Sequence, residues 1–203
     1  MVEQAQAVLG PNIRVIGKTN TQAPTLLTTP KDMQLAEQGV LALGLEAAQA
    51  LTDLEKTGAI IVAAFSDPGL RALRARVSIP VYGIGESVFM EAGADGRCFG
   101  IVTITPDTDL LASFTARTSE LGIGEQYCGA RVTQGDAQVL LANPALLDAA
   151  LSATIRESIK DGAQAIIFGG GPLSAAAERL QPQFSVPLLN PVAAAARAAF
   201  KGE

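Results

Sequence analysis

Two short turns, each following an apolar segment, hold most of the residues of this chain that could do chemistry. Residues 63–70 read AAFSDPGL, and residues 168–173 read FGGGPL. Backbone N–H groups at the start of a helix can bind a carboxylate or a polarised carbonyl. Glycines leave further N–H groups uncovered and let a ligand approach the backbone closely. We therefore place the candidate site at these two turns.

Both turns also have a purely structural interpretation. Ser66 or Asp67 is a typical cap for a helix over residues 69–77, with Pro68 in its first turn. From the sequence alone, this capping role is the favoured one. A tight turn needs only one glycine with positive φ, so the three glycines that end at Gly171 favour a ligand site.

Carboxylates are the candidate acid–base groups, because the chain contains no histidine. A Ser-His-Asp triad, a Cys-His pair and a His-ligated metal are thereby excluded, and no metal site is expected. Glu86 is the first candidate acid or base and Asp67 the second; their alternative roles are an exposed loop carboxylate and a helix cap. The candidate substrate-binding residues are hydroxyl-bearing residues or glycines near strand ends: Ser66, Thr103, Thr105, Gly170, Gly171 and Ser174. The Thr103 hydroxyl could equally bond to the backbone where its strand ends.

The elements that position these residues alternate between strands and helices. Short apolar runs bounded by Gly or Pro predict buried parallel strands at residues 13–16, 59–64, 81–84, 99–104, 165–168 and 186–189. Longer periodic stretches predict helices at residues 30–54, 69–77, 108–121, 144–160, 173–180 and 192–200. The first helix begins with Thr29 as N-cap and Pro30 at its first position, with Gly39 and Gly44 as candidate breaks. The alternation predicts an α/β fold with parallel sheets flanked by helices.

The sequence contains a loose internal repeat. Residues 58–81 and 162–188 each run from Gly-Ala through a buried strand, a turn with proline and a helix to a Ser-x-Pro segment. Such repetition predicts two similar, pseudo-symmetric lobes, residues 1–87 plus 191–203 and residues 88–190. We expect the two turns to face each other across one cleft between these lobes.

Composition limits the classes of partner. Hydrophobic residues make up 48% of the 203 residues and the net charge is −5, without a Lys/Arg cluster that would indicate nucleic-acid binding. No apolar run approaches the roughly 18 residues that span a membrane, and the first residues lack the features of a signal peptide. We expect a cytoplasmic protein with a small-molecule substrate. Cys98 and Cys128 are expected to be free, structural thiols, and the Ala-rich residues 191–200 are compatible with a homo-oligomer.

Five segments together resemble the Asp/Glu/hydantoin racemase family, most closely its hydantoin and allantoin racemase branch. They are AAFSDPGL at 63–70, IPVYGIGE at 79–86, FGIVT at 99–103, DGAQAIIFG at 161–169 and the end from Val186. The resemblance covers nearly the whole chain. It implies two lobes with an active site between them and an isomerase or racemase that needs neither pyridoxal phosphate nor another cofactor. The implied substrate is a small amino acid, hydantoin-like ring or amide.

The resemblance also implies a two-cysteine mechanism, for which this chain lacks the thiols. In the family one thiolate removes the proton at the stereocentre and the opposite thiol returns one, while backbone N–H groups stabilise the enolate. The two cysteine positions match Ala64 and Gly170, whereas Ser66 and Thr103 match substrate-binding positions. A lyase or hydrolase using the same pocket, or a non-catalytic small-molecule binding protein, therefore stays an alternative.

The beginning of the chain departs from the family as well. Residues 2–9 resemble the tail of the family's first helix and residues 11–16 its second strand, while residues 18–21 (KTNT) only superficially resemble its Asn-Pro-Asn-Thr substrate loop. On this reading the first strand and its loop are absent, which leaves neighbouring backbone groups unpaired. We hypothesise that Met1 is an internal methionine of a longer protein, or that another chain supplies the strand.

Overall fold

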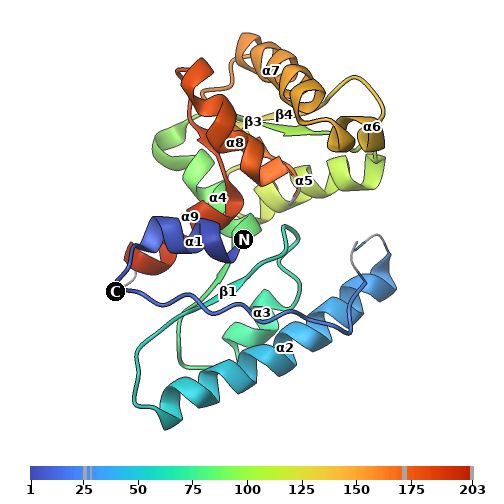
Figure 1. The fold of residues 1–203 in the computed structure, drawn as a ribbon. Helices are drawn as coiled ribbons and strands as arrows, with labels where there is room; N and C mark the ends of the chain where they lie inside the picture. Colours follow the sequence, from blue (N-terminus) through green and yellow to red (C-terminus); the bar gives the residue numbers. More distant parts are fainter. Residues whose placement is uncertain (25–26, 28, 171–172, 202–203) are drawn as a thin grey trace. The chain divides into compact units, whose positions relative to one another are not determined.

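A computed structural model of the chain describes residues 1–24, 27, 29–170 and 173–201 (Figure 1). The chain divides into two units, Met1–Ser87 with Val192–Glu203 and Val88–Pro191. Every strand pairing among the described residues is parallel, and the strands form one sheet of two strands and one of four. The predicted α/β class with parallel sheets flanked by helices is confirmed.

The first unit is built around a short parallel pair of strands. Its elements are α1 (Val2–Leu9), α2 (Pro30–Asp53), β1 (Ile60–Val62), α3 (Leu70–Arg74), β2 (Val81–Gly83), the start of α4 (Ile84–Ala92) and nearly all of α9 (Pro191–Lys201). Ile60 pairs with Val81 and Val62 with Gly83. The long α2 runs alongside α3 and β1 (Figure 1). Buried Leu70 and Leu73 of α3 pack with Val62 and Val81, so α3 is fixed against both strands.

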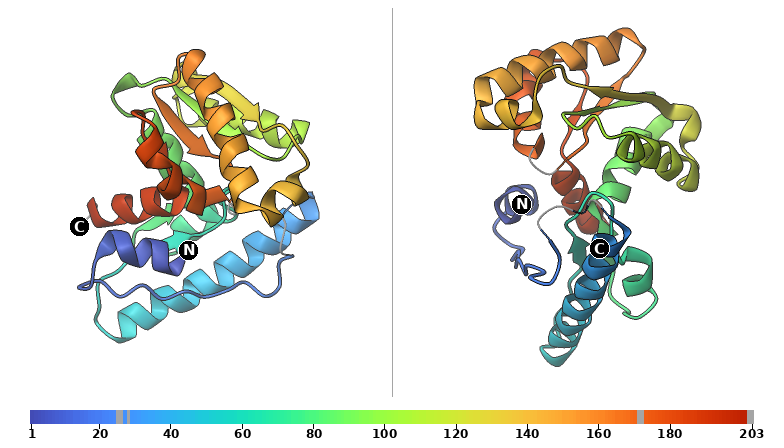
Figure 2. Two further views of the ribbon diagram at one scale, coloured as in Figure 1. Left: turned by 45° about the horizontal axis from the view of Figure 1, so that its top comes forward. Right: turned by 90° about the vertical axis from the view of Figure 1, so that its right-hand side faces the viewer.

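The second unit is a four-stranded sheet in the order β4-β3-β5-β6. Its strands are β3 (Phe99–Thr103), β4 (Tyr127–Val132), β5 (Ala165–Phe168) and β6 (Leu188–Leu189). Its helices are α5 (Thr108–Glu120), α6 (Ala137–Ala142), α7 (Pro144–Lys160) and α8 (Ser174–Leu180), with short 3-10 turns at Ala94–Gly96, Gly124–Gln126 and Gln181–Gln183. Figure 2 shows α7 and α5 on opposite faces of this sheet. β3 and β5 are buried throughout, which explains why both read as continuous apolar runs.

The long helix α2 follows the prediction at its start but not in its middle. The Thr29 side chain accepts the Asp32 N–H while Asp32 accepts the Thr29 N–H, a complete capping box. The helix passes unbroken through Gly39 and Gly44. A Cβ at Gly39 would lie 2.1 Å from the Asn20 side chain, and one at Gly44 would lie 2.4 Å from Leu73. The two glycines thus admit close neighbours and do not end the helix.

The predicted strand at residues 13–16 is wrong, because no strand forms there. The Gln6 side chain of α1 donates to the carbonyls of Gly10 (2.6 Å) and Ile13 (2.7 Å). Its Oε1 accepts the Val15 N–H at 3.1 Å. One side chain thereby satisfies backbone groups that a sheet ladder would otherwise pair, and Ile16 remains 67% exposed.

Besides the short 3-10 turns, one strand and two helices among the described residues were not predicted. β4 is an edge strand whose residues are all half-buried, and its Gly129 and Arg131 interrupt any apolar run. α6 has only six residues. α4 begins directly after β2. Of the remaining predicted strands and helices, β5 and α7 have the predicted bounds and the others are present with shifted ends. The largest change is in α3, which covers only Leu70–Arg74 of the predicted 69–77.

Candidate functional site

The turn after β1 is organised by the carboxylate of Asp67. This residue is 7% exposed and has a φ of 49°, a left-handed conformation that Asp tolerates better than most residues. Its Oδ1 accepts the Gly85 N–H at 3.0 Å, and its Oδ2 accepts the Glu86 N–H at 2.6 Å. Both donors belong to the first turn of α4, whose free N–H groups attract negative charge. Asp67 therefore caps α4.

The expected cap of α3 is accordingly wrong. Gly69 is the N-cap of α3, with a φ of 71° and no side-chain hydrogen bond. Asp67 is turned away from α3 by its own backbone conformation and reaches a different helix. The Ser66 side chain is exposed, and its hydroxyl lies 3.5 Å from the sulfur of Met33 on α2. Sequence proximity had indicated α3, but the contacts follow the tertiary fold.

Gly83 and Gly85 are needed because this turn presses against them. A Cβ on Gly83 would lie 2.3 Å from Oδ1 of Asp67, and a Cβ on Gly85 would lie 2.0 Å from the Phe65 carbonyl oxygen. A real Cβ does not lie so close to other heavy atoms, so either side chain would displace its neighbour. Gly83 and Gly85 thus allow the turn that contains Asp67 to approach the start of α4 closely.

Glu86 lies in the first turn of α4 and is held by an arginine. Oε1 of Glu86 accepts a hydrogen bond from Nη2 of Arg74 at 2.8 Å, and Oε2 accepts one from Nη1 at 3.1 Å. The Nε of Arg74 also donates to the Val81 carbonyl at 2.9 Å, which fixes the guanidinium. The Glu86 side chain keeps 25% of its surface exposed. A bidentate pair of this kind sets the direction of the carboxylate while leaving lone pairs accessible.

Arg74 is a residue that the sequence analysis missed. It is the last residue of α3 and stands twelve positions before Glu86, so no local motif links the two. Only the packing of α3 beside β2 brings them together. Basic residues at the end of a short helix are common, and nothing in the spacing distinguishes this one.

In the second unit, the predicted hydroxyl residues lie where β3 ends. Thr103 is completely buried, and its Oγ1 accepts the Thr105 N–H at 3.2 Å. This is the backbone bond that the sequence analysis weighed as an alternative for Thr103. Thr105 itself is exposed. Nearby, Thr133 donates its N–H to the Thr103 carbonyl at 2.8 Å.

The Thr133 hydroxyl is a second feature that the sequence did not reveal. Thr133 is 5% exposed, and within the described part of the chain its Oγ1 has no hydrogen-bond partner. Thr133 follows an edge strand whose polar and apolar residues show no regular alternation, so the sequence pattern did not single out this residue. A buried, unbonded hydroxyl costs about 1–3 kcal/mol, and this one lies at the same end of the sheet as Thr103.

The glycine turn after β5 is described in part. Gly169 donates its N–H to Val102 at 2.8 Å, and Gly170 has a φ of 154° that side chains rarely adopt. The Gly170 carbonyl accepts the Leu173 N–H at 3.1 Å, which closes the turn. Gly171 and the side chain of Ser174 lie outside the described residues. That the two turns line one cleft stays a prediction.

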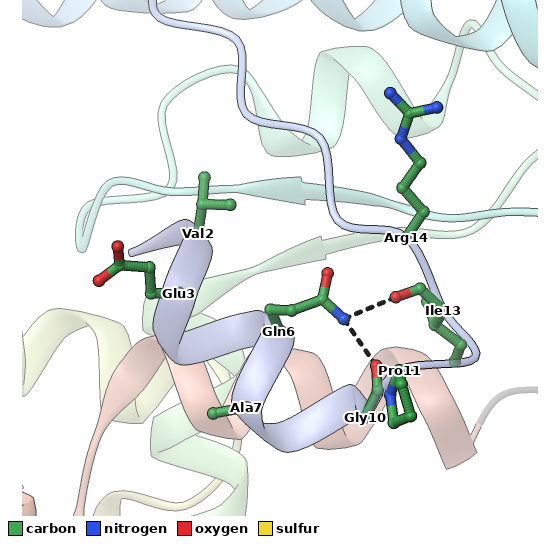
Figure 3. Close-up of a pocket in the computed structure, with 8 residues that line it drawn as sticks. All are labelled: Val2, Glu3, Gln6, Ala7, Gly10, Pro11, Ile13 and Arg14. Atoms are coloured by element: carbon green, nitrogen blue, oxygen red, sulfur yellow. Dashed lines mark hydrogen bonds between the residues drawn. The ribbon is translucent and has the colours of Figure 1, made fainter.

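A shallow groove elsewhere in the first unit carries none of the predicted site residues. It has a volume of about 710 Å³ and is lined by Val2, Glu3, Gln6, Ala7, Gly10, Pro11, Ile13 and Arg14. Figure 3 shows Gln6 in its floor, bonded to Gly10 and Ile13. The Gln6 amide already makes three hydrogen bonds to backbone groups, and both of its N–H donors are used. It is therefore a poor donor for a ligand.

The described residues form neither a metal-binding cluster nor a membrane span. Among them, no cluster of three or more His, Cys, Asp or Glu side chains could hold a metal ion. None of the helices in the described ranges is long and apolar enough to cross a membrane.

Comparison with known proteins places this fold and these turns in a family. The sequence model of Asp/Glu/Hydantoin racemase matches residues 1–199. This chain belongs to the Asp/Glu/hydantoin racemase family. The hydantoin racemase of Rhizobium meliloti is 28% identical over 206 residues, which cover 98% of this chain and 80% of that protein.

Solved structures agree with this membership. The allantoin racemase from Klebsiella pneumoniae superposes with a TM-score of 0.81 at 25% identity, covering 98% of this chain and 79% of the other. The Pseudomonas fluorescens allantoin racemase gives a TM-score of 0.76 at 21% identity, with 98% and 82% covered, and supports the fold alone. The predicted resemblance to the hydantoin and allantoin racemase branch is confirmed. Proteins of this family act on small-molecule substrates.

Proposed function

We propose that this racemase-family protein is a cofactor-independent isomerase of a small hydantoin-like ring, or of a related amino-acid derivative or amide. The observation that carries the proposal is the family match over residues 1–199, together with 28% identity to a hydantoin racemase across 98% of the chain. The carbon inverted would be the one next to the ring carbonyl, where removing a proton yields an enolate.

In this proposal Glu86 is the acid–base residue. Its carboxylate takes the proton from the stereocentre, and the electron pair of the broken C–H bond moves onto the carbonyl oxygen. A proton from solvent then returns to the opposite face, which completes inversion without a second side chain. Arg74 positions the Glu86 carboxylate through two hydrogen bonds, at 2.8 Å and 3.1 Å. Asp67, the second candidate, positions the Glu86 backbone.

The substrate-binding part of the proposal keeps the hydroxyl and glycine residues of the two turns. They are Ser66, Thr103, Thr105, Gly170, Gly171 and Ser174. Exposed hydroxyls such as those of Ser66 and Thr105 suit the ring's polar edge. Glycines at this turn suit a close approach of the substrate to the backbone, because they carry no side chain.

A non-catalytic binding protein is the second candidate, and one observation favours it. All four oxygens of the Asp67 and Glu86 carboxylates already accept hydrogen bonds from the protein. A substrate proton would have to compete with these protein donors for the carboxylate oxygens. A lyase or hydrolase on the same pocket would differ from both in consuming its substrate.

Chiral chromatography of single-enantiomer 5-substituted hydantoins separates these candidates. The isomerase should convert each enantiomer towards the racemate faster than buffer alone does. A lyase or hydrolase should yield new products. A binding protein should do neither, yet should show a higher melting temperature with the ligand, since ligands that bind the native state stabilise it. Unchanged enantiomers combined with such stabilisation would overturn the proposed isomerase.

A further inference from the structure

The turn after β1 rests on the first two turns of α2. The Ser66 hydroxyl lies 3.5 Å from the sulfur of Met33, and a Cβ at Gly69 would lie 3.2 Å from the carbonyl oxygen of Glu37. Met33 and Glu37 are four residues apart, so they lie one turn apart on the same face of the helix. These two contacts fix the turn, and with it Ser66, beside the Met33 side chain.

The hydrogen bond from Ser66 to Met33 is easily exchanged for another. A thioether sulfur is a weak acceptor, whereas an amide carbonyl is a strong one. Ser66 is exposed, so a ligand can reach its hydroxyl without opening the fold. A ring carbonyl that accepts the Ser66 hydrogen would therefore take the place of the sulfur. The Met33 side chain then lies directly beside the bound ring.

The residue that Ser66 contacts and the two residues that precede it are apolar and only half-buried. Met33, Ala64 and Phe65 each keep part of their surface accessible. Methionine has three rotatable bonds and a polarisable sulfur, so it adapts to the shape of an apolar neighbour. Sites for small molecules combine a few polar groups with apolar walls. Met33 offers such a wall next to the polar contact at Ser66.

We propose that Met33 is a specificity-determining residue of the site and that it selects hydantoins with an aliphatic 5-substituent. This inference rests on the proposed binding of a hydantoin-like ring at Ser66. An aliphatic substituent that packs on Met33 loses contact with water, which raises the affinity by up to about fourfold for each buried methylene. A polar substituent, such as the ureido group of allantoin, would lose hydrogen bonds to water there without gaining partners from a thioether.

A purely structural role for Met33 predicts a different result. If Met33 only held the turn in place, its replacement would weaken every ligand of the Ser66 hydroxyl to the same degree. A side chain that contacts the substituent changes the ratio of two affinities instead. The quantity to measure is therefore the ratio of the dissociation constants of two rings that differ only in this substituent.

The test is isothermal titration calorimetry of the intact protein with 5-methylhydantoin, 5-isobutylhydantoin and allantoin. The wild type should bind the isobutyl ring about tenfold more tightly than the methyl ring, because the additional carbons are partly buried. It should bind allantoin less tightly than the isobutyl ring. Met33→Ala should reduce the preference for isobutyl over methyl to about twofold, since most of the apolar wall is gone.

Two further variants keep the size of the side chain. Met33→Leu should retain the preference for the isobutyl ring, because it keeps the apolar volume. Met33→Gln should shift the preference towards allantoin, because its amide can bond to the ureido group. Met90→Ala removes an exposed methionine of α4 and is the matched control, which should leave all three affinities unchanged.

Equal affinities of the wild type for the methyl and isobutyl rings would overturn the inference, as would tighter binding of allantoin. So would a Met33→Ala variant, or in case of its poor folding a Met33→Gln variant, that weakens all three ligands by one common factor. Calorimetry measures binding alone, so the expected ratios without inversion would contradict the isomerase and leave the role of Met33 intact. Binding of none of the three rings would overturn both.

Discussion

The Asp67 carboxylate accepts the backbone N–H of Gly85 at 3.0 Å, eighteen residues along the chain. This bond joins two segments whose motifs, Asp-Pro-Gly-Leu and Gly-Ile-Gly-Glu, are separately weak. Asp67 supplies the acceptor, and the absent Cβ of Gly85 leaves room for the Phe65 carbonyl. The two motifs occur together because each makes the other's conformation possible.

Replacing Asp67 by alanine should destabilise the first unit by about 2–3 kcal/mol, because two N–H groups of α4 lose a charged acceptor in a buried place. Urea unfolding followed by circular dichroism measures the change. Asp107→Ala is the matched control, since that exposed N-cap accepts one N–H at 2.7 Å and its loss should cost about 1 kcal/mol. Equal losses for the two variants would contradict the capping role of Asp67.

Gly85→Ala should also destabilise the protein, by about 1–3 kcal/mol, because the new methyl would meet the Phe65 carbonyl at 2.0 Å. The same denaturation measurement applies. Gly124→Ala is the control, as its nearest neighbour would be 3.7 Å away. If Gly85→Ala unfolds at the wild-type urea concentration, the turn does not press on this glycine as the structure indicates.

The parts of the fold that could be predicted are those in which local signals and burial agree. β5 is continuously apolar and fully buried, and α7 starts with Pro144 behind the cap Asn143, so both were predicted at their observed bounds. The prediction for residues 13–16 failed because a single side chain, Gln6, bonds to the backbone seven and nine residues further on and takes the place of a strand ladder. A run of apolar residues does not reveal such a bond.

The candidate site also contains residues that the sequence could indicate and residues that it could not. Asp67 and Glu86 could be picked out as unusual carboxylates near strand ends, but their partners could not. Gly85 lies eighteen residues from Asp67, and Arg74 lies twelve from Glu86. Such contacts depend on how α3 packs on β1 and β2, which periodicity does not determine.

Stability at alkaline pH should depend on Cys128. The pKa of its thiol is raised from 9.0 to about 11 in the folded protein, so the unfolded chain ionises first. The contribution of this thiol to the free energy of unfolding is complete below about pH 9 and is lost as the pH rises to about 11. Cys128→Ser should therefore lose less stability than the wild type between pH 8 and about 10.5, measured by urea midpoints in reducing buffer. Parallel curves for the two proteins would refute this.

Removing both thiols should leave ligand binding largely intact. Cys98→Ser/Cys128→Ser takes away side chains at the amino-terminal edge of the four-stranded sheet, whereas the turn after β5 lies at its carboxyl-terminal edge. A thermal-shift screen with hydantoins, allantoin, amino acids and small dicarboxylates compares the variant with the wild type. A variant that folds normally but responds to none of the wild type's ligands would show that the site is elsewhere.

Restoring one thiol should not create two-thiol racemisation. Ala64→Cys supplies a group for one face of the substrate, while Gly170 still offers no proton on the other. Adding Gly170→Cys should introduce strain, because residue 170 has a φ of 154°. Chiral chromatography should therefore give no rate above wild type for Ala64→Cys alone. A large gain from that single change would contradict the assignment of position 170.

The most direct test of the proposed function is exchange of the hydrogen at the hydantoin stereocentre in deuterium oxide, followed by proton NMR. The wild type should replace this hydrogen by deuterium faster than buffer, with inversion at a comparable rate. Glu86→Gln should reduce both at least tenfold, whereas Glu46→Gln, which alters the exposed ion pair with Lys18, should leave both unchanged. Exchange by wild type and Glu86→Gln at the buffer rate, despite bound ligand, would contradict the isomerase proposal.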